Sequence, residues 1–379
     1  MSAPSQGAIV VAGSLAQKPG NGGHAWVFLQ YLLGFHRLGF DVTFVDQLPA
    51  GAENRDAAVE WLEQVMGGFG LQGQWSLLDD TGGHVAGLSV SEVLSRTRRS
   101  AFLLNVMGFL RREEVLAAAR RRVFLDIDPG FPQMWRALGL ADVFDGHDDF
   151  VTIAENIGEP GCRIPTCGLE WITTPQPVVL GQWPLRPESG TALTSVATWR
   201  GAYGPVEYEG RSYGLRAHEL RKFAALTGVS ALSLQLALAI HPADRADQDL
   251  LETFGWTLLD PATVAADPWA YRAFIQGSAG ELMVAKNMYV QARSGWISDR
   301  SLCYLSSGRP VVAQDTGFSS RYPTGAGLLA FGSFDEAVAA IEQVAAEPAK
   351  QAQAAREMAE AYFDSDVVLG RLLTALEAA

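Results

Sequence analysis

The segment from residue 294 to residue 317 holds the residues best suited to binding an anion. Its pattern predicts a loop, a helix that begins near Ser298, a turn and a strand. The first backbone N–H groups of a helix have no partner within the helix, so they attract anions. Arg300 adds a planar set of donors suited to phosphate oxygens. The alternative interpretation is that Ser298 or Asp299 merely caps the helix.

Short apolar runs alternate with amphipathic stretches around this segment, a pattern typical of parallel sheets covered by helices on both faces. Strands are predicted in the first half at 8–12, 42–46, 102–106 and 123–127. The pattern restarts later, with strands predicted at 193–198, 231–239, 256–259, 310–313 and 328–331. The Pro- and Gly-rich stretch 175–191 between the two halves is the predicted linker.

The sequence therefore predicts an α/β protein of two Rossmann-like domains that face each other across a cleft. The N-terminal domain is expected to cover residues 1–183 and the C-terminal domain residues 184–350. Residues 351–379 are expected to form helices that pack back toward the N-terminal domain. Ligands of such sheets bind beyond the carboxyl ends of the strands, so we expect the ligand site in the cleft.

The C-terminal motif resembles that of the GT-B glycosyltransferases, which bind a nucleotide-diphosphate sugar there. The resemblance rests on Ser-Asp-Arg-Ser at 298–301, Gly-Arg-Pro-Val-Val at 308–312 and Asp-Thr-Gly at 315–317. It implies that Ser298, Asp299, Arg300 and Ser301 bind the donor diphosphate. Two positions depart from the pattern: Gly295 and Cys303 stand where family-1 enzymes usually carry His and Glu, and where many family-4 enzymes carry two Glu residues.

The loop after the motif's strand is implied by the same resemblance to face the sugar hydroxyls. Asp315 and Thr316 would provide directional contacts through their polar side chains and backbone amides. The alternative interpretation is a simple turn before Gly317.

A glycine-rich loop at 19–24 precedes a predicted helix that ends at Gly39. In inverting family-1 enzymes, a His fifteen residues before the corresponding Gly takes the proton from the acceptor hydroxyl, and His24 has that spacing. Imidazole titrates near neutral pH, as such a base requires. Family-4 enzymes place two glycines here beside the donor phosphate, and Gly22 and Gly23 match them. The alternative is that His24 is an ordinary residue of the first helical turn.

A histidine base needs a carboxylate to orient it. The predicted strand at 123–127 contains Asp126, and Asp128 directly follows the strand. Side chains alternate between the two faces of a strand, so these two carboxylates lie on the same side. Asp128 lies nearer the cleft, so we expect it to orient His24 or to substitute for it. Asp128 is equally well explained as a turn residue before Pro129 and Gly130.

GT-B enzymes compensate the charge of the departing diphosphate mostly without a metal, through a helix dipole and basic side chains. Arg200 directly follows the strand at 193–198 and resembles the Arg of a Gly-Arg pair in family 4. Lys286 lies shortly before the anion-binding helix, and Arg211 and Arg216 could supply a further cation. Each of these alone is more often a solvated charge, so the expectation rests on Arg200, Lys286 and Arg300 together.

Composition excludes several classes of protein. The chain has 379 residues and a formal charge of −13, and an acidic surface repels phosphate backbones, so we do not expect nucleic-acid binding. Its three cysteines favour a reducing compartment and provide no zinc site. Neither a transmembrane stretch nor a signal peptide is recognisable, so we expect a cytoplasmic protein without stable membrane insertion.

Together, the resemblance implies a glycosyltransferase that moves a sugar from a nucleotide-diphosphate sugar to a small-molecule acceptor, plausibly in natural-product biosynthesis. The nucleotide sugar would be a co-substrate, with no permanently bound cofactor and no metal. The alternatives are a nucleotide-sugar epimerase or sugar phosphorylase of the same fold, or a non-catalytic nucleotide-sugar-binding protein. The sequence leaves open the nucleobase, the sugar, the acceptor, the stereochemical outcome and the oligomeric state.

Overall fold

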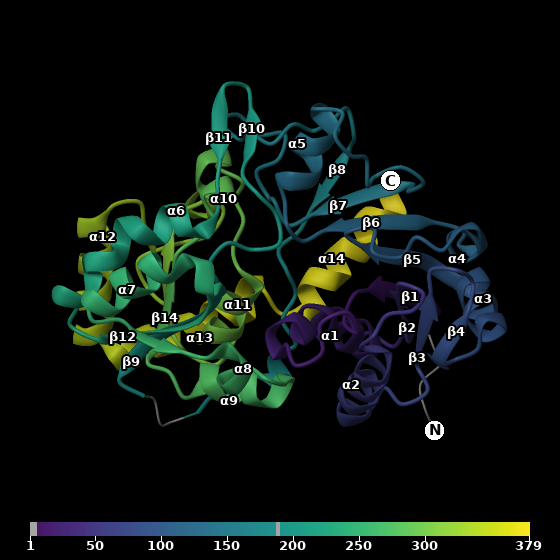
Figure 1. Cartoon of the computed structure of the whole chain (residues 1–379), viewed down its shortest axis with the longest axis horizontal. Helices are drawn as coiled ribbons and strands as arrows, with labels where there is room; N and C mark the ends of the chain where they lie inside the picture. The colour runs from purple at the N-terminus through teal and green to yellow at the C-terminus, as the bar shows by residue number, and fades with distance from the viewer. Residues whose placement is uncertain (1–5, 187–189) are drawn as a thin grey trace.

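The computed structural model of the chain describes residues 6–186 and 190–379, and it consists of two α/β lobes that lie side by side (Figure 1). The N-terminal lobe is built on an eight-stranded sheet and the C-terminal lobe on a six-stranded sheet. The described strands of the C-terminal sheet all pair in parallel, and in the N-terminal sheet the edge strand β4 (His84–Gly87) pairs antiparallel with β3 (Trp75–Asp79). This confirms the predicted fold class.

The N-terminal sheet has the strand order β4-β3-β2-β1-β5-β6-β7-β8. Its other strands are β1 (Ala8–Gly13), β2 (Asp41–Leu48), β5 (Ser100–Val106), β6 (Arg122–Asp126), β7 (Asp149–Thr152) and β8 (Trp171–Thr173). The helices of this lobe are α1 (Gly22–Arg37), α2 (Arg55–Gly68), α3 (Val90–Arg99), α4 (Glu113–Ala118) and α5 (Phe131–Ala137).

The C-terminal sheet has the strand order β13-β12-β9-β14-β15-β16. Its strands are β9 (Ala192–Thr198), β12 (Ser233–Ala239), β13 (Thr257–Leu259), β14 (Gly280–Met283), β15 (Val311–Gln314) and β16 (Leu328–Phe331). A separate hairpin of β10 (Val206–Tyr208) and β11 (Arg211–Tyr213) projects at the top of Figure 1, beside α5 of the other lobe.

The helices of the second half of the chain lie between these strands in the sequence and after the last of them. They are α6 (Arg216–Leu220), α7 (Arg245–Thr253), α8 (Pro261–Val264), α9 (Pro268–Gln276), α10 (Asn287–Ala292), α11 (Asp299–Ser306), α12 (Phe334–Ala346), α13 (Pro348–Tyr362) and α14 (Ser365–Ala378). The helix α12 begins with a capping box formed by Ser333 and Glu336. None of the helices in the described ranges is long and apolar enough to cross a membrane.

The elements that the sequence analysis did not predict are short or carry charge. The strand β14 has four residues and includes the fully buried Glu281, which interrupts its apolar run. The strand β7 has four residues, and its neighbour β8, at the edge of the sheet, has three. Such segments give no clear hydrophobic period, so neighbouring strands rather than their own sequence define them.

The helix α1 lies at the centre of the molecule and is buried along most of its length. The indole N–H of Trp26 donates to the backbone oxygen of Pro268, at the start of α9 in the other lobe, over 2.8 Å. The last helix, α14, lies along α1 (Figure 1), and at Gly34 a Cβ atom would come within 2.5 Å of Leu369. The chain therefore returns to the N-terminal lobe at its end.

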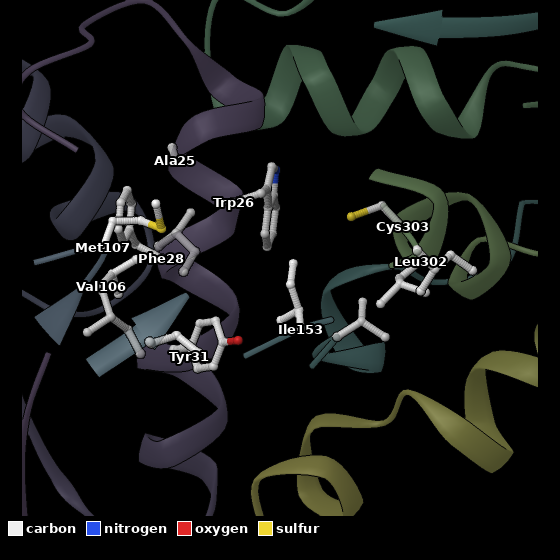
Figure 2. Close-up of a cluster of buried hydrophobic side chains, with 14 of the residues drawn as sticks. Ala25, Trp26, Phe28, Tyr31, Val106, Met107, Ile153, Leu302 and Cys303 are labelled. Carbon is white, nitrogen blue, oxygen red and sulfur yellow. The ribbon is translucent and has the colours of Figure 1, made fainter. Parts of the chain in front are cut away.

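The two lobes share an apolar contact next to α1. Figure 2 shows Trp26 and Ile153 of the N-terminal lobe facing Leu302 and Cys303 of α11. Gln30 of α1 lies with its amide nitrogen 3.8 Å from the Cys303 sulfur. Cys303, at the position of the family Glu, is therefore a buried packing residue between the lobes.

Candidate functional site

A cleft of about 550 Å³ separates the two lobes. Its N-terminal wall consists of the glycine-rich loop, the first turn of α1 and the loop after β6. Its C-terminal wall includes the end of β9 and the starts of α6 and α11. The cleft thus lies beyond the carboxyl ends of β6 and β9, where ligands of parallel sheets bind.

Among the described residues, four cationic side chains and two carboxylates line the cleft. The cations are Lys18, Arg216, Lys286 and Arg300, and the carboxylates are Asp128 and Asp299. The whole chain carries a charge of −13, so this cleft is a local exception. A positive surplus in a low-dielectric crevice attracts anions strongly.

Arg300 is the second residue of α11, and two hydrogen bonds hold its side chain against neighbouring strands. Its side chain donates to the buried carboxylate of Glu281 on β14 and to the backbone oxygen of Val196, the latter over 2.6 Å. Burial opposes the charge, but the neighbouring acidic groups, Glu281 first among them, together raise the pKa of Arg300. The Nη2 atom of Arg300 is buried and has no hydrogen-bond partner among the described residues.

Arg216 begins α6 and lies close to Arg300. Its Nη1 donates to the backbone oxygen of Val284 over 2.5 Å, while its Nε is buried and has no partner in the described part of the chain. Burial, together with repulsion from Arg300, lowers the pKa of Arg216 to about 10. Buried donors without partners are costly, so an anion that accepts from both guanidinium groups would be stabilised here.

His24 lies in the first turn of α1 and lines the cleft. Its Nε2 is 3.0 Å from the backbone oxygen of Ser14 and 3.1 Å from the Ser14 hydroxyl. A carbonyl oxygen only accepts, so Nε2 carries the proton and Nδ1 is the basic nitrogen. Burial, reinforced by the charge of Lys18, lowers the pKa of His24 to about 3, so the ring is neutral at pH 7.

Asp128 is not the partner of His24 in this structure. Its carboxylate accepts from the Lys286 ammonium, with N–O distances of 2.7 and 2.8 Å, and from the hydroxyl of Tyr289. The orienting contact that we expected Asp128 to make with His24 is provided by Ser14 instead. Both Lys286 and Tyr289 belong to the opposite lobe, so Asp128 spans the cleft.

Asp126 has a structural role. It is fully buried and accepts from Gln133 and Thr152 over 2.6 and 2.8 Å. Burial raises its pKa to about 7.

Gly22 and Gly23 allow the two lobes to approach closely. A Cβ atom at Gly22 would lie 2.0 Å from the backbone oxygen of Asp267, and one at Gly23 would lie 2.9 Å from the ring of Tyr271. The N–H of Gly22 already donates to the oxygen of Ala265 over 2.8 Å. Gly23 lines the cleft, whereas Gly22 holds the glycine-rich loop against the C-terminal lobe.

Besides Gly22, four residues that the resemblance assigned to the site do not line this cleft in the described structure. Arg200 is exposed and pairs with Asp244, and the Ser301 hydroxyl is buried within α11. Asp315 accepts from the N–H of Gly317 and from Ser319, and Thr316 is fully buried with its hydroxyl donating to Trp296. The positions of Asp315 and Thr316 fit the turn that was the alternative interpretation.

Sequence reasoning did not assign Lys18 or Tyr289 to the site, and it named Arg216 only as a possible further cation. Lys18 stands next to the Pro-Gly step of the glycine-rich loop, which was a usable signal. Arg216 follows the β10–β11 hairpin, and this insertion hid its position relative to β9. Nothing in the local sequence marks Tyr289.

Solved structures similar to this one are glycosyltransferases. An alpha-glucosyltransferase in complex with UDP and a 13-mer DNA matches 98% of this chain and 99% of its own at 11% identity, with a TM-score of 0.60. Anabaena HepE in complex with UDP-glucose matches 99% and 100% at 12% identity, also with a TM-score of 0.60. Sucrose-phosphate synthase from Thermosynechococcus elongatus matches 98% and 99% at 11% identity, with a TM-score of 0.54.

No protein-family model matches the chain, and no curated protein does either. The solved structures cover nearly the whole chain and establish that it has the GT-B fold.

Proposed function

We propose that this protein is a glycosyltransferase that uses a nucleotide-diphosphate sugar as its donor. The observation that carries the proposal is a pair of guanidinium groups, Arg216 and Arg300, that lie in a cationic cleft between the lobes and are only partly paired within residues 6–186 and 190–379. Several structures of the same fold contain UDP or UDP-glucose, which makes a UDP-sugar the first donor to test.

The diphosphate would lie against Arg216, Lys286, Arg300 and the N-terminus of α11. Transfer breaks the bond between the sugar and the diphosphate, so negative charge develops on the leaving group. Preorganised donors and cations stabilise that charge, because they need no reorganisation during the reaction. This assignment keeps the predicted roles of Ser298, Arg300 and Lys286 and gives Arg216 the role that we expected of Arg200.

The acceptor would enter beside the glycine-rich loop, where His24 and Asp128 line the cleft. The Nδ1 atom of neutral His24 would take the proton of the acceptor hydroxyl. A pKa of about 3 makes it a weak base in the free protein. A bound diphosphate would raise that pKa, since a nearby negative charge favours the protonated ring. A small-molecule acceptor and a role in natural-product biosynthesis remain part of this proposal.

Release of nucleoside diphosphate from a panel of nucleotide sugars tests the proposal. The wild type should release UDP from a UDP-sugar, slowly with water and faster with a suitable acceptor. Arg216→Met should bind the donor at least tenfold more weakly, and His24→Gln should retain donor binding but lose turnover. Wild-type protein that neither binds nor cleaves any nucleotide sugar would refute the proposal.

The weak basicity of His24 and the packing role of Cys303 favour one second candidate, a protein that binds a nucleotide sugar without turning it over. That candidate predicts binding with no release of nucleoside diphosphate. The same assay therefore separates the two functions.

A further inference from the structure

We infer that Tyr289 is a positioning residue that keeps Asp128 directed into the cleft after the donor diphosphate has displaced it from Lys286. The inference rests on the proposed function and goes beyond it, because it assigns an order to the binding of donor and acceptor.

The three side chains form one unit across the cleft. Asp128 follows β6 in the N-terminal lobe, Lys286 directly precedes α10 in the C-terminal lobe, and Tyr289 lies within α10. The ammonium bridges both carboxylate oxygens at 2.7 and 2.8 Å, and the Tyr289 hydroxyl donates to one of them. The side chains of Lys286 and Asp128 are 14% and 21% exposed, so water screens this ion pair only partly.

Asp128 neutralises a cation that the donor needs. Lys286 is one of the four cations of the cleft, and in this structure its ammonium pairs with the carboxylate of Asp128. A diphosphate held by Arg216 and Arg300 would approach the same ammonium with two negative charges. The carboxylate and the phosphate therefore compete for Lys286, and Asp128 acts as an internal competitor of the donor.

The surroundings of Tyr289 allow it to keep its hydrogen bond to Asp128 when a diphosphate displaces the carboxylate from Lys286. Its ring packs on Trp296, with centroids 4.2 Å apart, and its hydroxyl has Asp128 as its hydrogen-bond partner. Burial and the neighbouring carboxylate raise the pKa of Tyr289 well above its usual value, so the hydroxyl stays a donor. The carboxylate, released by Lys286 but held by Tyr289, would then have lone pairs available for an acceptor hydroxyl.

The consequence is a preferred order in which the donor binds first and frees Asp128 for the acceptor. While Lys286 and Tyr289 both donate to it, Asp128 uses most of its acceptor positions on residues of the C-terminal lobe. This arrangement couples the two halves of the site through one ion pair between the lobes.

Calorimetric titration with UDP tests the competition. Asp128→Asn removes the competing charge while conserving shape, so it should bind UDP about tenfold more tightly than the wild type. Tyr289→Phe keeps the ring and should bind UDP within about twofold of the wild type. In the donor-turnover assay, Tyr289→Phe should lower kcat at least tenfold with little change in the donor KM, and the double variant should be no slower than Asp128→Asn.

Tyr322→Phe is a matched control. The Tyr322 hydroxyl also donates to a carboxylate of the other lobe, that of Glu155, but neither residue lines the cleft in the described structure. This variant should keep the wild-type kcat. If Tyr322→Phe lowers kcat as much as Tyr289→Phe does, the role of Tyr289 is only structural and the inference fails.

The remaining outcomes separate this inference from the proposed function. If the wild type binds UDP but Asp128→Asn does not tighten binding, the inference fails and the proposed function stands. If the wild type binds no nucleoside diphosphate, both fail. Should Asp128→Asn not fold, Asp128→Ser provides the same titration and is judged by the same criterion.

Discussion

Arg300 and Glu281 form an ion pair inside the C-terminal lobe, with side chains 8% and 0% exposed. The pair links α11 to β14, beneath the start of the helix to which we assign the diphosphate. Arg300 therefore serves both the stability of the lobe and the charge of the cleft.

The first prediction separates these two contributions. Arg300→Met removes the charged partner of the buried Glu281 carboxylate and leaves it only the Ser195 hydroxyl at 3.4 Å, which should lower the free energy of unfolding by about 3–5 kcal/mol. Urea denaturation measures this loss. Adding Glu281→Gln should restore stability in part without restoring UDP binding. Full stability of Arg300→Met alone would show that the ion pair is dispensable.

The second prediction compares two arginines near the C-terminal wall. Arg216→Met should weaken UDP binding at least tenfold, or about 1.4 kcal/mol, because it removes a buried cation of the cleft. Arg200→Gln should leave UDP binding unchanged, because Arg200 is exposed and pairs with Asp244. The opposite result in the same titration would restore the role that the sequence assigned to Arg200.

The third prediction concerns acid stability. The pKa of folded His24 is lowered to about 3, so between pH 6.5 and pH 3 the unfolded chain binds a proton that the folded chain does not. This contribution to stability is present above pH 6.5 and is lost as the pH falls. Between pH 7.5 and pH 5, the wild type should lose about 1–2 kcal/mol more stability than His24→Gln.

Buried carboxylates change the stability with pH in the opposite direction, but they do not affect the comparison of the wild type with His24→Gln. Burial raises the pKa of both Asp46 and Asp126 to about 7, so their contribution falls as the pH rises from about 4 to 7. Both proteins carry these groups, so the contribution cancels between them. Parallel pH profiles of stability for the two proteins would contradict the assignment of His24 as a neutral buried ring.

The fourth prediction tests the close approach of the lobes. Gly22→Ala would place a methyl group 2.0 Å from a backbone oxygen of the C-terminal lobe, so the unfolding free energy should fall by about 1–3 kcal/mol. UDP binding should weaken with it, because the two walls of the cleft move apart. The control Gly67→Ala, in α2 with open space around it, should be neutral or slightly stabilising. Equal effects of both substitutions on thermal unfolding would argue against the proposed contact.

The sequence predicted the elements with strong local signals. The strand β16 has the predicted bounds, and α12 begins at a capping box of Ser333 and Glu336 that the sequence spacing itself contains. The predicted helices of the tail are α13 and α14, and α14 begins with Asp364 as its cap. Each of these elements carries its own apolar period or capping residue, so a single sequence was sufficient.

The contacts within the site were harder to predict because they join distant parts of the chain. Asp128 and Lys286 are 158 positions apart, and no local pattern predicts that one pairs with the other. Arg200 and Arg216 both follow β9, and only the path of the hairpin between them decides which enters the cleft. Residue types near the cleft could thus be predicted, but their partners could not.

The most direct test of the central claim is thermal unfolding of the wild type with UDP, UMP and uridine at equal concentrations. A ligand that binds only the folded state raises the unfolding temperature, and the cationic cleft should recognise the diphosphate. UDP should therefore raise the unfolding temperature most, UMP less and uridine least, with a smaller effect of UDP at high salt. A rise with uridine equal to that with UDP, or no rise with UDP, ADP or GDP, would contradict a diphosphate site in this cleft.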